Sequence, residues 1–177
     1  MRGAILRLEA AGALGMVLAG SALHFAYGWS GAWRPLALVA AVNESIWEHL
    51  KLAFWPGLAW ALVERAALPG LGGQLWAAKG VSLLAISGLI VGVFTGYTAI
   101  LGRNLLVLDI GTFVLAVALG QALSAVLLAR RWPRWARRAG TALLLAQVAA
   151  FSLFTFHPPA HWLFLEARSG TYGIPAR

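Results

Sequence analysis

Five apolar segments limit the fold of this chain more than any other feature. They lie at Leu8–Tyr27, Ile46–Val63, Leu75–Ile100, Leu105–Leu128 and Ala139–Phe156. A helix rises about 1.5 Å per residue, so roughly 18 to 25 residues cross a hydrocarbon core about 30 Å thick. A continuous apolar segment in a bilayer pairs its backbone groups internally only as a helix. We therefore predict an all-α integral membrane bundle of about five transmembrane helices.

The composition points the same way. Hydrophobic residues make up 60% of the chain, charged residues 11%, and the mean hydropathy is +0.77. A soluble domain carries about 25% charged residues, so this chain has too little polar surface to coat a water-soluble globule. The breaks between the segments are short, and we expect a single transmembrane domain over residues 1–177. The absence of cysteine excludes thiolate catalysis and Cys-ligated metal sites.

The basic residues predict the orientation. The net charge is +8, and one short stretch between the last two apolar segments holds Arg130, Arg131, Arg134, Arg137 and Arg138. This is typical of a cytoplasmic loop facing anionic lipid, so we expect membrane lipids as partners and no nucleic acid. Arg2, Arg7, Arg65 and Lys79 fall on the same side. We predict a multi-pass protein of the cell (plasma or inner) membrane, with its N-terminus inside and its C-terminus outside.

Most of the carboxylates and histidines gather at the predicted outer face. The four histidines and most carboxylates map there, at positions His24, Glu44, Glu48, His49, Asp109, His157, His161 and Glu166. Glu9 and Glu64 lie inward, each within two residues of an arginine that could neutralise it. An ionisable residue at the bilayer centre costs at least about 2.5–3.5 kcal/mol, so such residues usually face the protein interior or a wet cavity. The clustering predicts a shared site.

Each of these residues also has a structural interpretation. Ser45-x-x-Glu48 ahead of an apolar run is a capping box, which satisfies amides at a helix start. Asp109 could pair with Arg103 or Lys51, and His24 could donate a hydrogen bond between helices. His157 precedes a proline, so we expect a helix end there and an interfacial turn that carries His157 and His161.

Three sequence motifs resemble those of a known group of proteins. They are Asn43–Lys51 (Asn-Glu-Ser-Ile-Trp-Glu-His-Leu-Lys), His24–Gly31, and the segment Phe154–Ile174 with its Gly-Thr-Tyr-Gly-Ile ending. The chain resembles an uncharacterised bacterial family of small multi-spanning membrane proteins. The resemblance implies a membrane location and a shared architecture, and it implies no activity.

The leading hypothesis is a metal site that opens outward. His49, His157, His161 and His24 are the candidate nitrogen ligands, and Glu44, Glu48 or Asp109 would supply an oxygen ligand or a catalytic base. Asn43 and Lys51 are further polar residues of the same region. Histidine and carboxylate without cysteine suit zinc, with iron or manganese as alternatives. Such a metal could activate water for hydrolysis of a lipid-like substrate.

Two other functions stay open at this point. The face that carries Glu44, Glu48 and Lys51 could relay protons or bind an ion in a transporter or channel. No internal repeat supports this, and Gln121 and Gln147 are the main further polar residues toward the inner side. Alternatively, the polar residues only fix helix packing in a non-catalytic accessory protein. The sequence leaves the oligomeric state undetermined.

Overall fold

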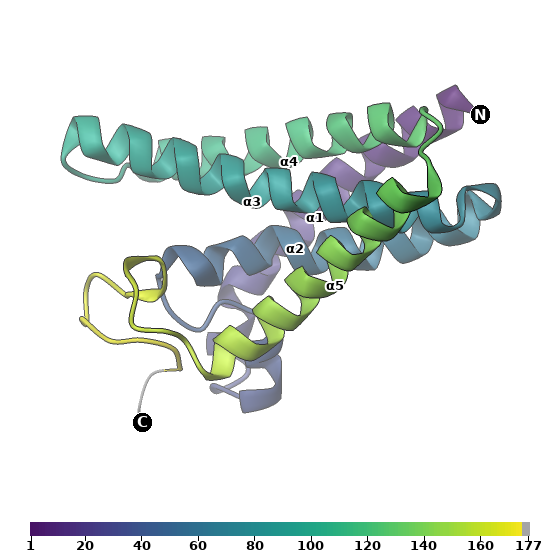
Figure 1. The fold of residues 1–177 in the computed structure, drawn as a ribbon. Helices are drawn as coiled ribbons and strands as arrows, with labels where there is room; N and C mark the ends of the chain where they lie inside the picture. The colour runs from purple at the N-terminus through teal and green to yellow at the C-terminus, as the bar shows by residue number, and fades with distance from the viewer. Residues whose placement is uncertain (175–177) are drawn as a thin grey trace.

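The structure, a computed structural model, describes residues 1–174 and confirms the all-α prediction (Figure 1). Its five long helices are α1 (Arg2–Trp29), α2 (Ile46–Ala67), α3 (Gly73–Leu101), α4 (Leu106–Leu128) and α5 (Arg134–Phe156). Three short 3₁₀ helices lie in the connections, namely η1 (Arg34–Leu38), η2 (Pro69–Leu71) and η3 (Trp162–Phe164). These boundaries agree with the five apolar segments.

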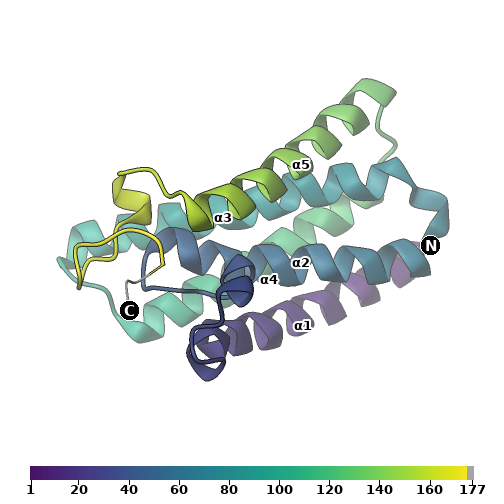
Figure 2. The same ribbon diagram turned by 90° about the horizontal axis from the view of Figure 1, so that it is seen from below.

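Four of the long helices close a ring. Helix α1 packs against α2 and α4, while α3 packs against the other sides of α2 and α4. Helix α5 lies outside this ring, packs along α3 and meets η1 near its end (Figure 2). Successive helices alternate in direction, and the N-terminus and the C-terminal segment therefore lie at opposite ends of the bundle (Figure 1).

We name the two ends of the bundle by their residues. The arginine-rich end contains the N-terminus and the connections α2–α3 and α4–α5, with Arg65 and the arginines from Arg130 to Arg138. The histidine end contains the connections α1–α2 and α3–α4 and the segment after α5, with His24, His49, His157 and His161. The arginine cluster and the histidines thus lie at opposite ends of the bundle.

Helices α1, α3, α4 and α5 are long and apolar enough to cross a membrane, as expected for a multi-pass membrane protein. Helix α2 is more polar because it carries Glu48, Lys51 and Glu64, and these three side chains are buried in the bundle. That α2 also crosses the bilayer, and that the N-terminus lies inside, remain predictions from the sequence.

The core lies between the two ends. Met16, Phe54, Leu83, Ile86 and Val117 are among its buried residues, drawn from α1 to α4. On α2 the stretch 52–63 is apolar apart from its tryptophans, and it separates Lys51 from Glu64. The described polar clusters at the two ends are therefore divided by apolar packing.

A close helix crossing fixes α5 against α3. A Cβ atom at Gly80 would clash with the carbonyl oxygen of Gly140, and one at Gly140 would lie 2.8 Å from the Cβ atom of Ala77. The amide of Gln147 donates to the carbonyl oxygen of Gly80 over 2.8 Å. Small residues permit this approach where lipid weakens the hydrophobic force between helices.

Candidate functional site

A cluster of three side chains meets at the histidine end. Among residues 1–174, His24, Glu44 and His49 form the one group of potential metal ligands whose donor atoms all lie within 4.8 Å of one another. The Nε2 atom of His49 lies 3.4 Å from Oε2 of Glu44, and Nε2 of His24 lies 4.0 Å from Oε1. The two carboxylate oxygens thus face different imidazoles. We call this group the His24–Glu44–His49 site.

The start of α2 positions two members of the site. Ser45 is the N-cap, and its hydroxyl accepts a hydrogen bond of 3.4 Å from the amide of Glu48. The predicted capping box is only half formed, because the Glu48 carboxylate accepts from the amide of Val42 at 3.0 Å instead of the Ser45 amide. This cap holds Glu44 just before the helix and His49 one turn into it.

A backbone contact sets the proton position on His49. Its Nδ1 atom lies 2.8 Å from the carbonyl oxygen of Ser45, which can only accept a hydrogen bond. Nδ1 therefore carries a proton, and Nε2 is the atom turned toward Glu44. In neutral imidazole Nε2 then offers a lone pair, and in imidazolium it offers a second N–H. Metal-ligating histidines are commonly oriented by this kind of carbonyl contact.

His24 reaches the site from the last turns of α1. Its ring centroid lies 5.2 Å from that of His49, and its ring packs edge-on against Phe25 at 4.7 Å. The Nδ1 atom of His24 is buried and has no hydrogen-bond partner within the described chain. Phe25 is 54% exposed, so one side of the site borders an apolar surface.

Glu44 is the charged centre of the group. It lies in the connection before α2, and its side chain is 51% exposed. The hydrogen bond from His49 lowers the pKa of the Glu44 carboxyl below its usual value of 4.5, and the charges of His49, His24 and Arg168 lower it further. Glu44 is therefore ionised at neutral pH and available as an anionic ligand.

The residue types suit a transition-metal ion. Two imidazole nitrogens and a carboxylate oxygen are the protein ligands of several catalytic zinc centres, and also of the facial triad of non-haem iron enzymes. In both cases the protein leaves coordination positions open for water or substrate. The partial exposure of all three side chains leaves room for such a position.

Glu48 and Lys51 lie apart from this group. Oε2 of Glu48 lies 2.6 Å from Nζ of Lys51, and both side chains are almost completely buried. Lys51 also donates to the carbonyl oxygen of Ala37 over 2.6 Å and to the hydroxyl of Thr155 over 3.2 Å. It therefore links α2 to η1 and α5. These contacts give Glu48 and Lys51 a structural position beneath the site.

Asn43 and Asp109 are also engaged elsewhere. The amide of Asn43 donates to the carbonyl oxygen of Gly173 over 2.8 Å, which ties the C-terminal segment to the start of α2. Asp109 accepts hydrogen bonds from Tyr97 and Asn104 at the α3–α4 connection. The partners of Asp109 are thus neither Arg103 nor Lys51.

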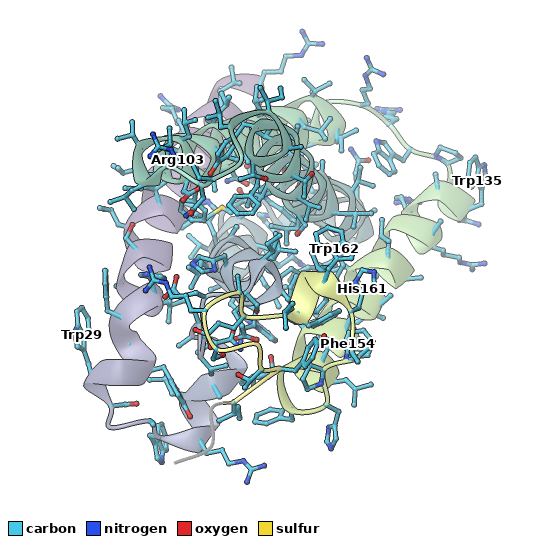
Figure 3. The ribbon with its side chains drawn as sticks, turned by 90° about the vertical axis from the view of Figure 1, so that its left-hand side faces the viewer. Trp29, Arg103, Trp135, Phe154, His161 and Trp162 are labelled. Carbon is cyan, nitrogen blue, oxygen red and sulfur yellow. The ribbon has the colours of Figure 1, made fainter. Side chains whose placement is uncertain are left out.

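His157 and His161 do not join the His24–Glu44–His49 site. His157 ends α5, as the following proline predicts, and His161 is the N-cap of η3. The ring of His161 accepts a hydrogen bond of 3.4 Å from the amide of Leu163. Figure 3 shows His161 and Trp162 together on the C-terminal segment, apart from Trp29 at the end of α1.

A second polar cluster lies toward the arginine-rich end, and the sequence analysis did not identify it. The ammonium of Lys79 lies 2.9 Å from Oε2 of Glu9 and 2.8 Å from Oε2 of Glu64. The hydroxyl of Ser124 donates to Glu9 over 2.5 Å, and Gln121 lies 3.4 Å from Lys79. All five side chains are buried. Lysine, and not a neighbouring arginine, neutralises these carboxylates.

The sequence contained one signal of this cluster. Glu9, Glu64 and Lys79 each stand within or beside an apolar segment, on α1, α2 and α3, at similar distances from the arginine-rich end. Buried charges in a bilayer are expected to pair, so these three could have been matched. With Gln121 and Ser124 on α4, the cluster fixes all four helices of the ring to one another.

One comparison with known proteins places the chain in a family. A family model described as "Family of unknown function (DUF6512)" matches residues 10–174. No curated protein and no solved structure matches the chain. The matched range includes all three members of the His24–Glu44–His49 site and the whole five-helix bundle except the first eight residues of α1. The chain belongs to the DUF6512 family.

Proposed function

We propose that this protein is a membrane metalloenzyme in which the His24–Glu44–His49 site binds one zinc-type divalent ion and hydrolyses an ester or amide bond of a lipid-like substrate. The observation that carries the proposal is the convergence of three donor atoms within 4.8 Å, one of them on an imidazole whose other nitrogen is held by a backbone carbonyl. Two histidines and one carboxylate leave a fourth position for water.

The ion would supply the activation of water, because zinc lowers the pKa of bound water to about 7. The residues would supply the geometry. His24 and His49 would hold the ion from two helices, and Glu44 would supply an oxygen ligand. The Glu44 carboxylate would also accept the proton of the water. The water oxygen bonds to the carbonyl carbon, the ester or amide bond breaks, and the proton passes to the leaving alcohol or amine.

The surroundings favour a lipid-like substrate. Phe25 packs against His24 and is 54% exposed, and Trp29 stacks on Phe25 and is 75% exposed. Helix α1, which carries both aromatic residues, is one of the helices apolar enough to cross a membrane. A substrate with an acyl chain can therefore reach the site along α1 from the lipid phase.

Metal analysis of the detergent-purified protein tests the proposal. After zinc loading and removal of free metal, we expect about one zinc per chain in the wild type and a loss of most of it in His49→Ala and His24→Ala. The matched control is His161→Ala, which removes an exposed histidine of the same end and should retain the metal. Zinc well below one per chain in the wild type, or equal zinc in His24→Ala, would overturn the site.

Hydrolysis is measured separately with a fluorogenic long-chain ester in mixed micelles. We expect turnover by the zinc-loaded wild type and the His161→Ala control, and none by Glu44→Gln. A protein that binds zinc at this site but hydrolyses neither esters nor amides would refute the enzymatic part of the proposal. Bound zinc without turnover would support a non-catalytic metal protein.

A further inference from the structure

A cavity of about 410 Å³ lies at the arginine-rich end, between the beginnings of α3 and α5. Three arginines of α5 line the cavity, namely Arg134, Arg137 and Arg138. The rest of the lining consists of Gly73, Thr141, Ala142 and Leu145. None of the three guanidinium groups forms an ion pair or donates a hydrogen bond within the part of the chain that the structure describes. The Nε atom of Arg137 is buried without a partner. The cavity therefore holds uncompensated positive charge.

Two helix beginnings add to this field. Gly73 is the first residue of α3 and Arg134 is the first residue of α5, and neither first turn contains an acidic residue. Neither N-cap residue makes a side-chain cap hydrogen bond. The free amides and the positive ends of the helix dipoles thus lie beside the three arginines. An anion with several oxygens is the complementary ligand, because guanidinium groups bind phosphate through paired hydrogen bonds.

An apolar groove continues from the cavity along α5. Its volume is about 320 Å³, and it shares Thr141 and Leu145 with the cavity. The rest of its lining comes from α2, α3 and α5, and consists of Leu58, Trp76, Leu144 and Val148. Residues 134–148 of α5 extend over about 21 Å, compared with about 15 Å for the hydrocarbon of one leaflet. The groove therefore points from the arginines toward the membrane interior.

We infer that this cavity and groove form a binding site for one anionic phospholipid. Its phosphate lies among Arg134, Arg137 and Arg138, and an acyl chain occupies the groove beside Trp76. A free phosphate ion would satisfy the arginines but would leave the apolar groove without a ligand. The inference is independent of the proposed hydrolytic function, because the two sites lie at opposite ends of the bundle.

Native mass spectrometry of the detergent-purified protein tests the inference, with phosphatidylglycerol, phosphatidylcholine and inorganic phosphate as probes. The wild type should retain one phosphatidylglycerol in preference to phosphatidylcholine. The double variant Arg134→Gln/Arg137→Gln should bind phosphatidylglycerol about tenfold more weakly. The matched control is Arg130→Gln/Arg131→Gln, which removes the same charge from the adjacent α4–α5 connection, outside the cavity, and should bind as the wild type does.

A third variant separates the lipid from a free anion. Leu145→Trp fills the groove and keeps all the arginines, so it should weaken phosphatidylglycerol binding while the protein remains folded by circular dichroism. Equal weakening in both arginine double variants would overturn the inference, because diffuse attraction would then explain the binding. Equal retention of phosphatidylcholine, or displacement of phosphatidylglycerol by inorganic phosphate at equal concentration, would also overturn it.

Discussion

The Nζ atom of Lys51 lies 2.6 Å from Oε2 of Glu48, in an ion pair that is closed off from the surface of the protein. Removing one partner from a buried pair typically costs about 3–5 kcal/mol, because the other charge is left without compensation. We therefore expect Lys51→Met to lower the thermal unfolding midpoint in detergent strongly. The double variant Glu48→Gln/Lys51→Met should be the more stable of the two. A double variant no more stable than Lys51→Met would contradict this account.

The cluster of Glu9, Glu64 and Lys79 carries two carboxylates and one ammonium, so its formal charge is −1. We expect an asymmetry between its variants. Lys79→Met leaves two carboxylates facing each other in the interior and should be severely destabilising, by about 3–5 kcal/mol. Glu64→Gln balances the charge and keeps a similar shape, so it should cost much less. Unfolding midpoints measured side by side check this order, and equal losses would argue against it.

The crossing of α3 and α5 depends on Gly80. A methyl group there would clash with the carbonyl oxygen of Gly140, whereas Gly88 on the same helix has no atom within 4 Å of such a methyl. Gly80→Ala should therefore lower stability by about 1–3 kcal/mol through overpacking. Gly88→Ala is the matched control and should be neutral or slightly stabilising, because alanine favours a helix. Equal midpoints for the two variants would refute the crossing described above.

The pH dependence of Glu44 follows from its lowered pKa. Because the hydrogen bond from His49 and nearby positive charges lower the folded-state pKa below 4.5, the ionised carboxylate stabilises the fold at pH values above 4.5. That contribution disappears as the pH falls through the folded-state pKa. In metal-free protein, Glu44→Gln should therefore unfold below the wild-type temperature at neutral pH, and the difference should disappear at a lower pH at which the folded-state carboxyl is protonated. A difference in unfolding temperature that persists at the lower pH would mean that Glu44 does not stabilise the fold through its charge.

Much of the architecture could be predicted from the sequence. The five apolar segments became α1 to α5, and the proline after His157 marked the end of α5. The length and hydropathy of a segment are local properties, so they can be read directly from the sequence. The lateral arrangement of the helices is not local, and the position of α5 outside the ring depends on contacts such as Gly80 with Gly140.

The candidate site could likewise be predicted only in part from the sequence. The Asn43–Lys51 motif is unusually polar, but its spacing does not say which side chains point toward His24. The structure brings Glu44 and His49 to His24 and turns Glu48 toward Lys51. The Glu9–Lys79–Glu64 contacts join residues up to 70 positions apart, so no spacing rule within one segment could have paired them.

X-ray absorption at the zinc edge of the zinc-loaded protein tests the central claim most directly. The account predicts that the zinc is surrounded by two imidazole ligands and oxygen ligands at about 2.0–2.2 Å, and that His24→Ala and His49→Ala lose most of this zinc signal. His157→Ala should leave the spectrum unchanged. A wild-type spectrum without histidine scattering, or one that changes in His157→Ala and not in His24→Ala, would contradict the His24–Glu44–His49 site.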